Sequence, residues 1–97
     1  MTFSSEKHLQ DEAIRYLKSL DDCWFIKTVG GATQSGGAPD LIVCYRGRFY
    51  GFELKLGGDY KLTGRQRLTL KRIREAGGVG MEITSVEQMI EVLKYPL

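Results

Sequence analysis

The segment that most restricts the fold of this chain runs from residue 38 to residue 55 and reads APDLIVCYRGRFYGFELK. Two apolar runs, Leu41–Tyr45 and Arg48–Leu54, stand on either side of an Arg-Gly pair, a pattern typical of a β-hairpin. A two-residue turn fixes the register, since paired positions then sum to 93 and Asp40 lies directly across from Glu53. The sequence thus predicts two neighbouring carboxylates at the open end of a hairpin.

The alternation of side chains along a strand shows which groups share a face of this hairpin. Glu53 and Lys55 project from one face, whereas Phe52 and Leu54 project from the other. Two ionised carboxylates a few ångströms apart repel each other, and each is costly to bury unless a cation lies between them. If the turn has two residues and no bulge, the hairpin predicts a divalent-cation site on Asp40 and Glu53, with Lys55 near enough to share the role.

Helices and further strands are expected on both sides of the hairpin. Apolar residues recur at helical spacing after a serine cap, and two capping-box patterns follow later in the chain. The expected helices run from Ser4 or Ser5 to about Leu20, from Thr63 to about Ala76, and from Ser85 to before Pro96. The other expected strands are Cys23–Val29 and Met81–Ile83, with a glycine-rich loop over residues 30–37.

The order of these elements is αβββαβα, which predicts an α/β fold with a mixed β-sheet flanked by helices. A chain of 97 residues with 42% hydrophobic content is long enough for one core and short of two. We therefore expect a single domain that spans residues 1–97.

Helical geometry places two further polar residues. With 100° of rotation per residue, Glu6 lies within roughly 60° of the apolar stripe of the first expected helix, whereas Glu12 lies about 120° from Glu6. Glu6 therefore faces inward and is a candidate ligand, although an acid in a first turn also favours the helix dipole without any site. The same rotation places Gln66 on the inner face of the second expected helix, where its capping-box position is a sufficient structural explanation.

The sequence also indicates which environments to set aside. No apolar run approaches the roughly 20 residues that a membrane span needs, and the first ten residues lack the apolar centre of a secretion signal. Cys23 and Cys44 form neither a CxxC pair nor a disulfide framework, so both are expected to be small buried hydrophobes. We expect no membrane partner and a cytoplasmic location, in a bacterium or, for a phage protein, in its host.

The residues around the hairpin resemble a nuclease motif. The stretch GGAPDLIVCYRGRFYGFELK contains Pro-Asp and, after 12 intervening residues, Glu-x-Lys, which is similar to the PD-(D/E)xK motif. The short spacing, the helix with Glu6 ahead of LQ…I.YL, and LTGRQ after the Glu-x-Lys resemble the VRR-NUC family of that superfamily, in particular its small stand-alone members. The likeness covers residues 6–77 and implies a restriction-endonuclease-like core.

The resemblance implies metal-dependent hydrolysis of phosphodiester bonds by a DNA endonuclease. The ligands for Mg²⁺ or Mn²⁺, ions that prefer oxygen, would be the side chains of Glu6, Asp40 and Glu53 and the main-chain carbonyl of Leu54. The residues expected to take part in catalysis are Asp40, Glu53, Lys55 and Gln66. Of these, Lys55 would orient the attacking water or stabilise the pentavalent phosphorus, and Gln66 would position a neighbouring group. Similar nucleases leave 5′-phosphate and 3′-hydroxyl ends, and the same products are expected here.

Basic residues are concentrated after the hairpin. No acid lies between Tyr60 and Arg74, and an enzyme that cuts a polyanion must offset its own carboxylates to attract it. The candidate nucleic-acid contacts are Lys61, Arg65, Arg67 and Lys71, extended at the hairpin tip by Arg46 and Arg48. A solvated helix face is the simple alternative for such a run. Tyr60 is a candidate for stacking on unpaired bases, and Trp24 and Phe25 are expected in the core.

Assembly is inferred from the resemblance. Stand-alone VRR-NUC proteins are similar to junction-resolving enzymes in forming symmetric dimers, which implies a homodimer that acts on branched or Holliday-junction DNA. The last expected helix is apolar on more than one stripe and is a candidate interface, with ordinary packing on the sheet as the alternative.

Two other function classes stay open. One is a catalytically silent nucleic-acid-binding module of the same fold, and the other is an interaction protein in which Asp40, Glu53 and Lys55 form a structural ion pair. The complete set of acids together with Lys55 favours the enzyme.

Overall fold

The computed structural model describes residues 5–28, 37–56 and 61–94, and within these ranges helices and strands follow the predicted order αβββαβα. The helices are α1 (Glu6–Lys18), α2 (Gly64–Glu75) and α3 (Val86–Lys94). The strands are β1 (Cys23–Lys27), β2 (Leu41–Tyr45), β3 (Arg48–Leu54) and β4 (Val79–Ile83). None of the described helices is long and apolar enough to cross a membrane.

The four strands form one mixed sheet in the order β1-β2-β3-β4. The first three pair antiparallel, and β4 pairs parallel with β3. In the β2–β3 hairpin, Tyr45 pairs with Arg48 and Leu41 with Phe52, so the predicted register is confirmed. Arg46 and Gly47 both have positive φ, 52° and 82°, as a two-residue turn that follows the twist of a hairpin requires.

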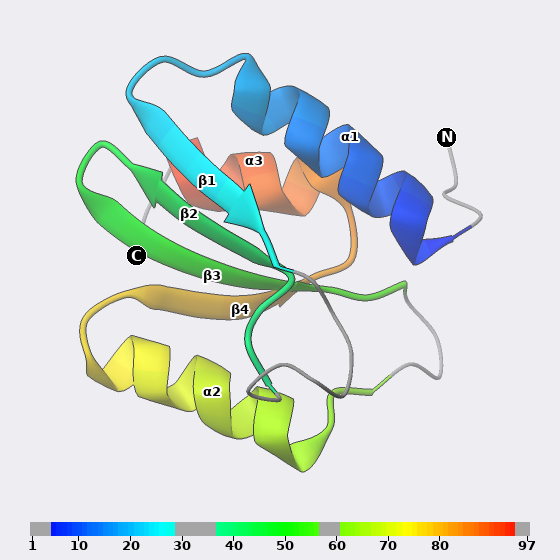
Figure 1. Cartoon of the computed structure of the whole chain (residues 1–97), viewed down its shortest axis with the longest axis vertical. Helices are drawn as coiled ribbons and strands as arrows, with labels where there is room; N and C mark the ends of the chain where they lie inside the picture. Colours follow the sequence, from blue (N-terminus) through cyan, green and yellow to red (C-terminus); the bar gives the residue numbers. More distant parts are fainter. Residues whose placement is uncertain (1–4, 29–36, 57–60, 95–97) are drawn as a thin grey trace.

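Helices cover both faces of the sheet (Figure 1). On one face, α1 and α3 pack against the sheet and against each other, and the main core lies there. Its largest fully buried side chains are Tyr50, Phe52, Leu9, Leu17, Leu41, Leu54, Ile83 and Met89. On the other face lies α2, whose contacts are with β3 and β4. Helix α2 therefore lies over β3 and β4, and among the described helices none packs on the outer side of β1 and β2.

Two glycines in neighbouring strands allow α2 to lie close to the sheet. Gly51 and Gly80 are paired across β3 and β4. A Cβ at Gly80 would lie 2.7 Å from the Leu70 carbonyl oxygen, and a Cβ at Gly51 would lie 2.6 Å from Ile73 and 3.0 Å from Pro39. The missing side chains thus make room both for α2 and for the Pro39 that precedes Asp40.

Element ends differ from the sequence prediction at three places. Strand β1 ends at Lys27, before the predicted end at Val29, and Thr28 already lies outside the strand. Helix α1 ends at Lys18 and not near Leu20, because Ser19 caps it and Asp22, with φ 56°, turns the chain into β1. Strand β4 begins at Val79 and not at Met81 because the parallel ladder already pairs Tyr50 with Val79. Val29, the predicted loop over residues 30–36, Tyr60 and Pro96 lie outside the described residues.

The prediction that Trp24 is a core residue was wrong, as was the expectation that Cys44 is buried. Trp24 is 61% exposed, and Cys44, its partner across the ladder, is exposed as well. Alternation along β1 directs Trp24 and Ile26 to the half of the sheet that α2 does not cover, whereas Phe25 packs against the core. The sequence of β1 is apolar on both faces, and it does not show which of the two faces a helix covers.

Candidate active site

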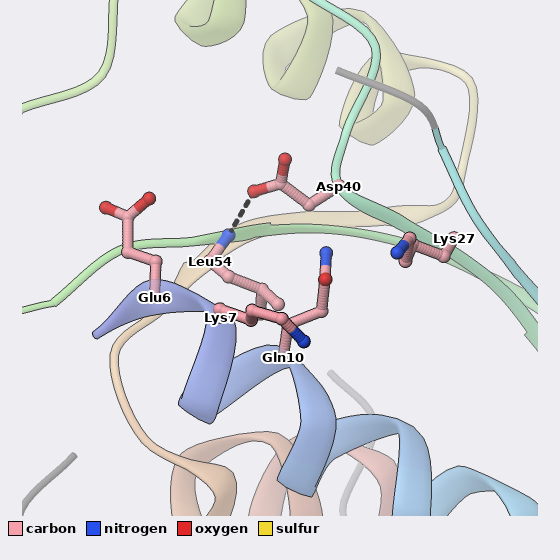
Figure 2. Close-up of a pocket in the computed structure, with 6 residues that line it drawn as sticks. All are labelled: Glu6, Lys7, Gln10, Lys27, Asp40 and Leu54. Carbon is pink, nitrogen blue, oxygen red and sulfur yellow. Dashed lines mark hydrogen bonds between the residues drawn. The ribbon is translucent and has the colours of Figure 1, made fainter. Parts of the chain in front are cut away.

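The site begins at the open end of the hairpin, where β2 starts and β3 ends. The Asp40 carboxylate continues the ladder there, since its Oδ2 accepts a hydrogen bond of 2.8 Å from the main-chain N–H of Leu54 (Figure 2). The N–H and C=O of one strand residue point to the same edge, so the Leu54 carbonyl also faces the Asp40 side. Two predicted oxygen ligands, from Asp40 and Leu54, therefore lie at the same edge.

Glu53 is the one buried charged or polar residue of the described core, at 0% exposure. Burial, followed by the charge and the hydrogen-bonding of Asp40, raises the pKa of Glu53 from 4.5 to about 8, while Lys55 lowers this pKa and Glu6 raises it. Within the described ranges, the Glu53 Oε2 atom is buried without a hydrogen-bond donor. Glu53 is thus a buried carboxyl group next to a second carboxylate, and one of its oxygens has no hydrogen-bond donor. A bound cation would offset the repulsion between the two acids and supply the missing contact.

Gln66 contacts this carboxyl from α2. Its Oε1 accepts a hydrogen bond of 2.8 Å from the Thr63 N–H, and the Gln66 N–H donates to Thr63 Oγ1, so the predicted capping box is confirmed. The Nε2 of the same amide approaches Glu53 Oε1 to 3.5 Å. The capping box therefore fixes the position of the amide that faces Glu53. Gln66 can act both as a capping residue of α2 and as a residue of the site.

A pocket of about 340 Å³ opens in front of Asp40 (Figure 2). Its lining residues come from α1, from the end of β1 and from the hairpin, and they are Glu6, Lys7, Gln10, Lys27, Asp40 and Leu54. Figure 2 shows the Glu6 carboxylate turned away from Asp40. In the part of the chain that the structure describes, no group of three or more acidic, histidine or cysteine residues is placed to hold a metal ion. Glu6 thus lines the pocket without joining the Asp40–Glu53 pair.

No family model matches the sequence, and no curated protein matches it. A solved structure described as a VRR_NUC domain is similar with a TM-score of 0.74 and 25% sequence identity, over 95% of this chain and 97% of that chain. Another, described as a VRR_NUC domain protein, has a TM-score of 0.76 and 17% identity, over 97% and 88% of the two chains. This chain has the VRR-NUC fold. The similarity spans nearly the whole length of each chain, so the predicted nuclease-type α/β architecture is confirmed.

The residues that this VRR-NUC fold places at the hairpin end fit a divalent cation. They offer two carboxyl groups and one main-chain carbonyl, all hard oxygen donors of the kind that Mg²⁺ and Mn²⁺ prefer. The unsatisfied Glu53 oxygen and the raised pKa of Glu53 are observations that a bound cation accounts for. The predicted ligands Asp40, Glu53 and Leu54 are together in space, and Glu6 stands at the rim of the same pocket.

Lys55 follows β3 and stays close to Glu53. Its main-chain N–H donates to the Ile83 carbonyl at 3.0 Å, which ties the Glu-x-Lys segment to β4. The Lys55 ammonium group is near enough to lower the pKa of Glu53. The VRR-NUC fold therefore places the Lys55 ammonium group near the buried Glu53 carboxyl, in agreement with the prediction that both side chains project from the same face of the strand.

The predicted nucleic-acid contacts divide into two sets. Arg65 lies near the site, because a Cβ at Gly37, three residues before Asp40, would lie 2.7 Å from its Cγ. Lys61 precedes the same end of α2 and Lys71 is exposed further along this helix, whereas Arg67 donates to the Leu62 carbonyl at 3.0 Å. Arg46 lies in the turn and Arg48 directly follows it, at the other end of the hairpin and roughly 15 Å along the strands from Asp40. The structure does not bring them to the site.

Sequence reasoning missed three residues of the pocket: Lys7, Gln10 and Lys27. Lys27 ends β1 and pairs across the ladder with Leu41, directly next to Asp40. Gln10 lies one helical turn after Glu6, on the same side of α1. That four-residue spacing was the available sequence signal, whereas the position of Lys27 depends on pairing between strands that are distant in sequence.

Proposed function

We propose that this protein is a metal-dependent nuclease that hydrolyses phosphodiester bonds of DNA. The observation that carries the proposal is the buried Glu53 carboxyl beside Asp40, with an unsatisfied oxygen and a raised pKa, on a VRR-NUC fold. Burial of this acid costs folding free energy, so its placement next to a second acid is hard to explain by stability. The raised pKa of Glu53 is itself typical of a functional site.

The protein side chains take distinct parts in this proposal. The ligands for Mg²⁺ or Mn²⁺ are Asp40, Glu53 and the Leu54 carbonyl, with Glu6 at the pocket rim. A bound divalent cation supplies charge neutralisation at the phosphate and a lower pKa for the attacking water. Lys55 donates to the phosphate or holds the water, and Gln66 fixes the orientation of the Glu53 carboxyl. The expected products carry 5′-phosphate and 3′-hydroxyl ends.

The nucleic-acid partner follows from the charges near the site. Two carboxylates repel a phosphodiester backbone, and nearby cations, led by Arg65 on α2 and Lys61 just before this helix, offset that repulsion. We propose DNA as the substrate, with a preference for branched or junction forms, and a cytoplasmic location.

The homodimer is also part of the proposal, and the outer side of β1 and β2 is the surface that suits it. The candidate interface helix α3 is packed on the core, with Met89 at 0% and Leu93 at 3% exposure. Trp24, Cys44 and Phe49 instead form one cross-strand row on this side of the sheet, with Ile26 beside it. A row of uncharged side chains can pack on its own copy about a two-fold axis without burying like charges.

A cleavage assay tests the proposed activity. Single-stranded, duplex and four-way-junction DNA are incubated with the protein and Mg²⁺ or Mn²⁺, and we expect cleavage that EDTA abolishes. Asp40→Ala and Lys55→Ala should remove cleavage, whereas Lys94→Ala, an exposed lysine on α3, should not. DNA binding without cleavage under either ion would instead indicate a silent nucleic-acid-binding module. Absence of binding even at low salt, with strong destabilisation by Asp40→Ala, would indicate a structural ion pair.

A further inference from the structure

The part of the pocket formed by α1 and the end of β1 carries polar groups that the catalytic proposal does not use. Gln10 and Lys27 both line it, and Figure 2 shows their side chains extending into the space beside Asp40. Within the described ranges, neither the Gln10 amide nor the Lys27 ammonium group takes part in a hydrogen bond or an ion pair. A neutral donor and a cation that face the same opening offer the contacts that a phosphate oxygen accepts.

The position of Lys27 is fixed with respect to Asp40. The next residue, Thr28, donates from its main-chain N–H to the Asp40 carbonyl at 3.0 Å, and its Oγ1 donates to the Pro39 carbonyl at 2.7 Å. These two bonds tie the end of β1 to the residue pair that begins the motif. The Lys27 side chain alternates with Ile26 and points to the α1 face, where the pocket lies.

Lys7 adds a second positive charge at the rim of the pocket. Its Nζ lies 3.2 Å from Asp11 Oδ2, in a pair whose two side chains are largely exposed. Such a pair contributes little and is screened by salt, so it does not hold Lys7 away from a stronger anion. The α1 side of the site therefore carries the cations Lys7 and Lys27. The α2 side carries Arg65 and, just before the helix, Lys61.

We propose that Gln10 and Lys27 bind a backbone phosphate next to the one that is hydrolysed. This inference rests on the proposed nuclease function and specifies the path of the substrate strand. The strand crosses the end of the sheet between the α1–β1 wall and the start of α2, with Asp40 and Glu53 in the middle. Lys27 supplies the charge, and Gln10 supplies a neutral hydrogen-bond donor.

Binding at several salt concentrations tests the proposal without any turnover. A fluorescently labelled single-stranded oligonucleotide is titrated with the protein in EDTA, and Kd is measured from 50 to 200 mM NaCl by anisotropy. Lys27→Ala should raise Kd about tenfold and lower the slope of log K against log salt by about one unit, because one phosphate contact is lost. Gln10→Ala should raise Kd a few-fold with an unchanged slope, because it carries no charge.

Controls separate this site from general charge effects. Lys18→Ala removes one exposed lysine from the last turn of α1 and should leave the slope and Kd within about twofold of the wild type. Lys27→Arg should retain the salt slope. Circular dichroism and the midpoint of urea unfolding check that each variant is folded. If Lys27→Ala matches Lys18→Ala in both Kd and slope, the proposal is wrong.

The same measurements distinguish this inference from the proposed activity. If the wild type cuts DNA and Lys27→Ala binds and cuts as well as the wild type, the inference alone fails. If the wild type binds in the manner described but never cuts with Mg²⁺ or Mn²⁺, the inference stands and the nuclease proposal fails. If the wild type binds no oligonucleotide at 50 mM NaCl, both fail.

Discussion

At the scale of single residues, the protonation of Glu53 links the stability of the protein to pH. A carboxyl group with a folded pKa of about 8 and an ordinary pKa of 4.5 holds its proton in the folded state over a pH range in which the unfolded chain has lost it. The folded state then binds more protons than the unfolded state, so stability falls as pH rises through this window. The buried acid thus lowers stability at neutral pH.

We predict this pH dependence for the metal-free protein. Between about pH 4.5 and pH 8 the free energy of unfolding should decrease by a few kcal/mol, since each unit of pKa shift corresponds to about 1.4 kcal/mol. Urea unfolding in EDTA at pH 5, 6, 7 and 8 measures it. Glu53→Gln should remove most of the slope, and Glu91→Gln, at an exposed position of α3, should not. An equal slope in wild type and Glu53→Gln would show that Glu53 is not the cause.

Gln66 allows a second residue-scale prediction, because its two contacts can be separated. Gln66→Ala removes both the capping box and the amide near Glu53, so it should cost about 1 kcal/mol of stability and reduce cleavage roughly 10- to 100-fold. Thr63→Ala removes the cap oxygen and keeps the main-chain N–H that holds Gln66. It should lower stability similarly with little loss of cleavage. Equal loss of cleavage in both variants would contradict a role of the Gln66 amide at the site.

At the scale of secondary-structure elements, the distance between α2 and the sheet sets the position of Gln66. That distance depends on Gly51 and Gly80, over which Ile73 and Leu70 lie. A side chain at Gly80 must displace the helix or the strand, because its nearest neighbours include main-chain atoms of Leu70. A side chain at Gly51 instead meets the end of the Ile73 side chain and the Pro39 ring. The pairing of the strands fixes Asp40 and Glu53, and the close packing of α2 brings the amide to them.

Gly80→Ala should therefore reduce both stability and cleavage. Its Cβ would lie 2.7 Å from the Leu70 carbonyl, and overpacking of this kind costs about 1–3 kcal/mol. Gly64→Ala is the matched control, since nothing lies within 4 Å of its Cβ. It should be neutral or slightly stabilising. Urea unfolding and the cleavage assay measure the two effects, and a Gly80→Ala protein as stable as Gly64→Ala would contradict the account of α2.

The hairpin end could be predicted from the sequence because it depends on local rules. The turn, the alternation of the strands and the resulting register place Asp40 against Glu53 without knowledge of the rest of the fold. The capping box similarly oriented Gln66. The close contact of α2 at Gly80 was not predictable, since a glycine has no side chain to mark its face. Lys27 and the exposure of Trp24 depend on which strands pair and on where the helices lie, which no local pattern encodes.

At the scale of the whole molecule, the candidate site and the exposed apolar row lie at different places on the sheet. The pocket and the buried acid lie at the end where β2 starts. The apolar row of Trp24, Cys44 and Phe49 lies toward the hairpin tip, where Arg46 is in the turn and Arg48 follows it. A contact between two copies through this row would leave both pockets open to substrate. This separation is compatible with two active sites on one branched DNA molecule.

The oligomeric state tests this arrangement. We expect the mass of a dimer by light scattering at micromolar concentration, and we expect Trp24→Ser to shift the protein to a monomer that is still folded. Leu68→Ser, which also removes an exposed apolar side chain at 46% exposure on α2, should leave the dimer intact. A wild-type monomer would contradict the homodimer, and a dimer unaffected by Trp24→Ser would contradict this choice of surface.

The central claim is that Asp40, Glu53 and the Leu54 carbonyl hold a divalent cation. Calorimetric titration of Mn²⁺ at pH 7, in two buffers of different ionisation enthalpy, measures it most directly. We predict binding with release of about one proton, because ligands must be deprotonated on binding and Glu53 carries its proton at this pH. Asp40→Asn and Glu53→Gln should each abolish the heat of binding. Absence of Mn²⁺ binding by the wild type, with and without DNA, or binding that survives in both variants, would contradict the account.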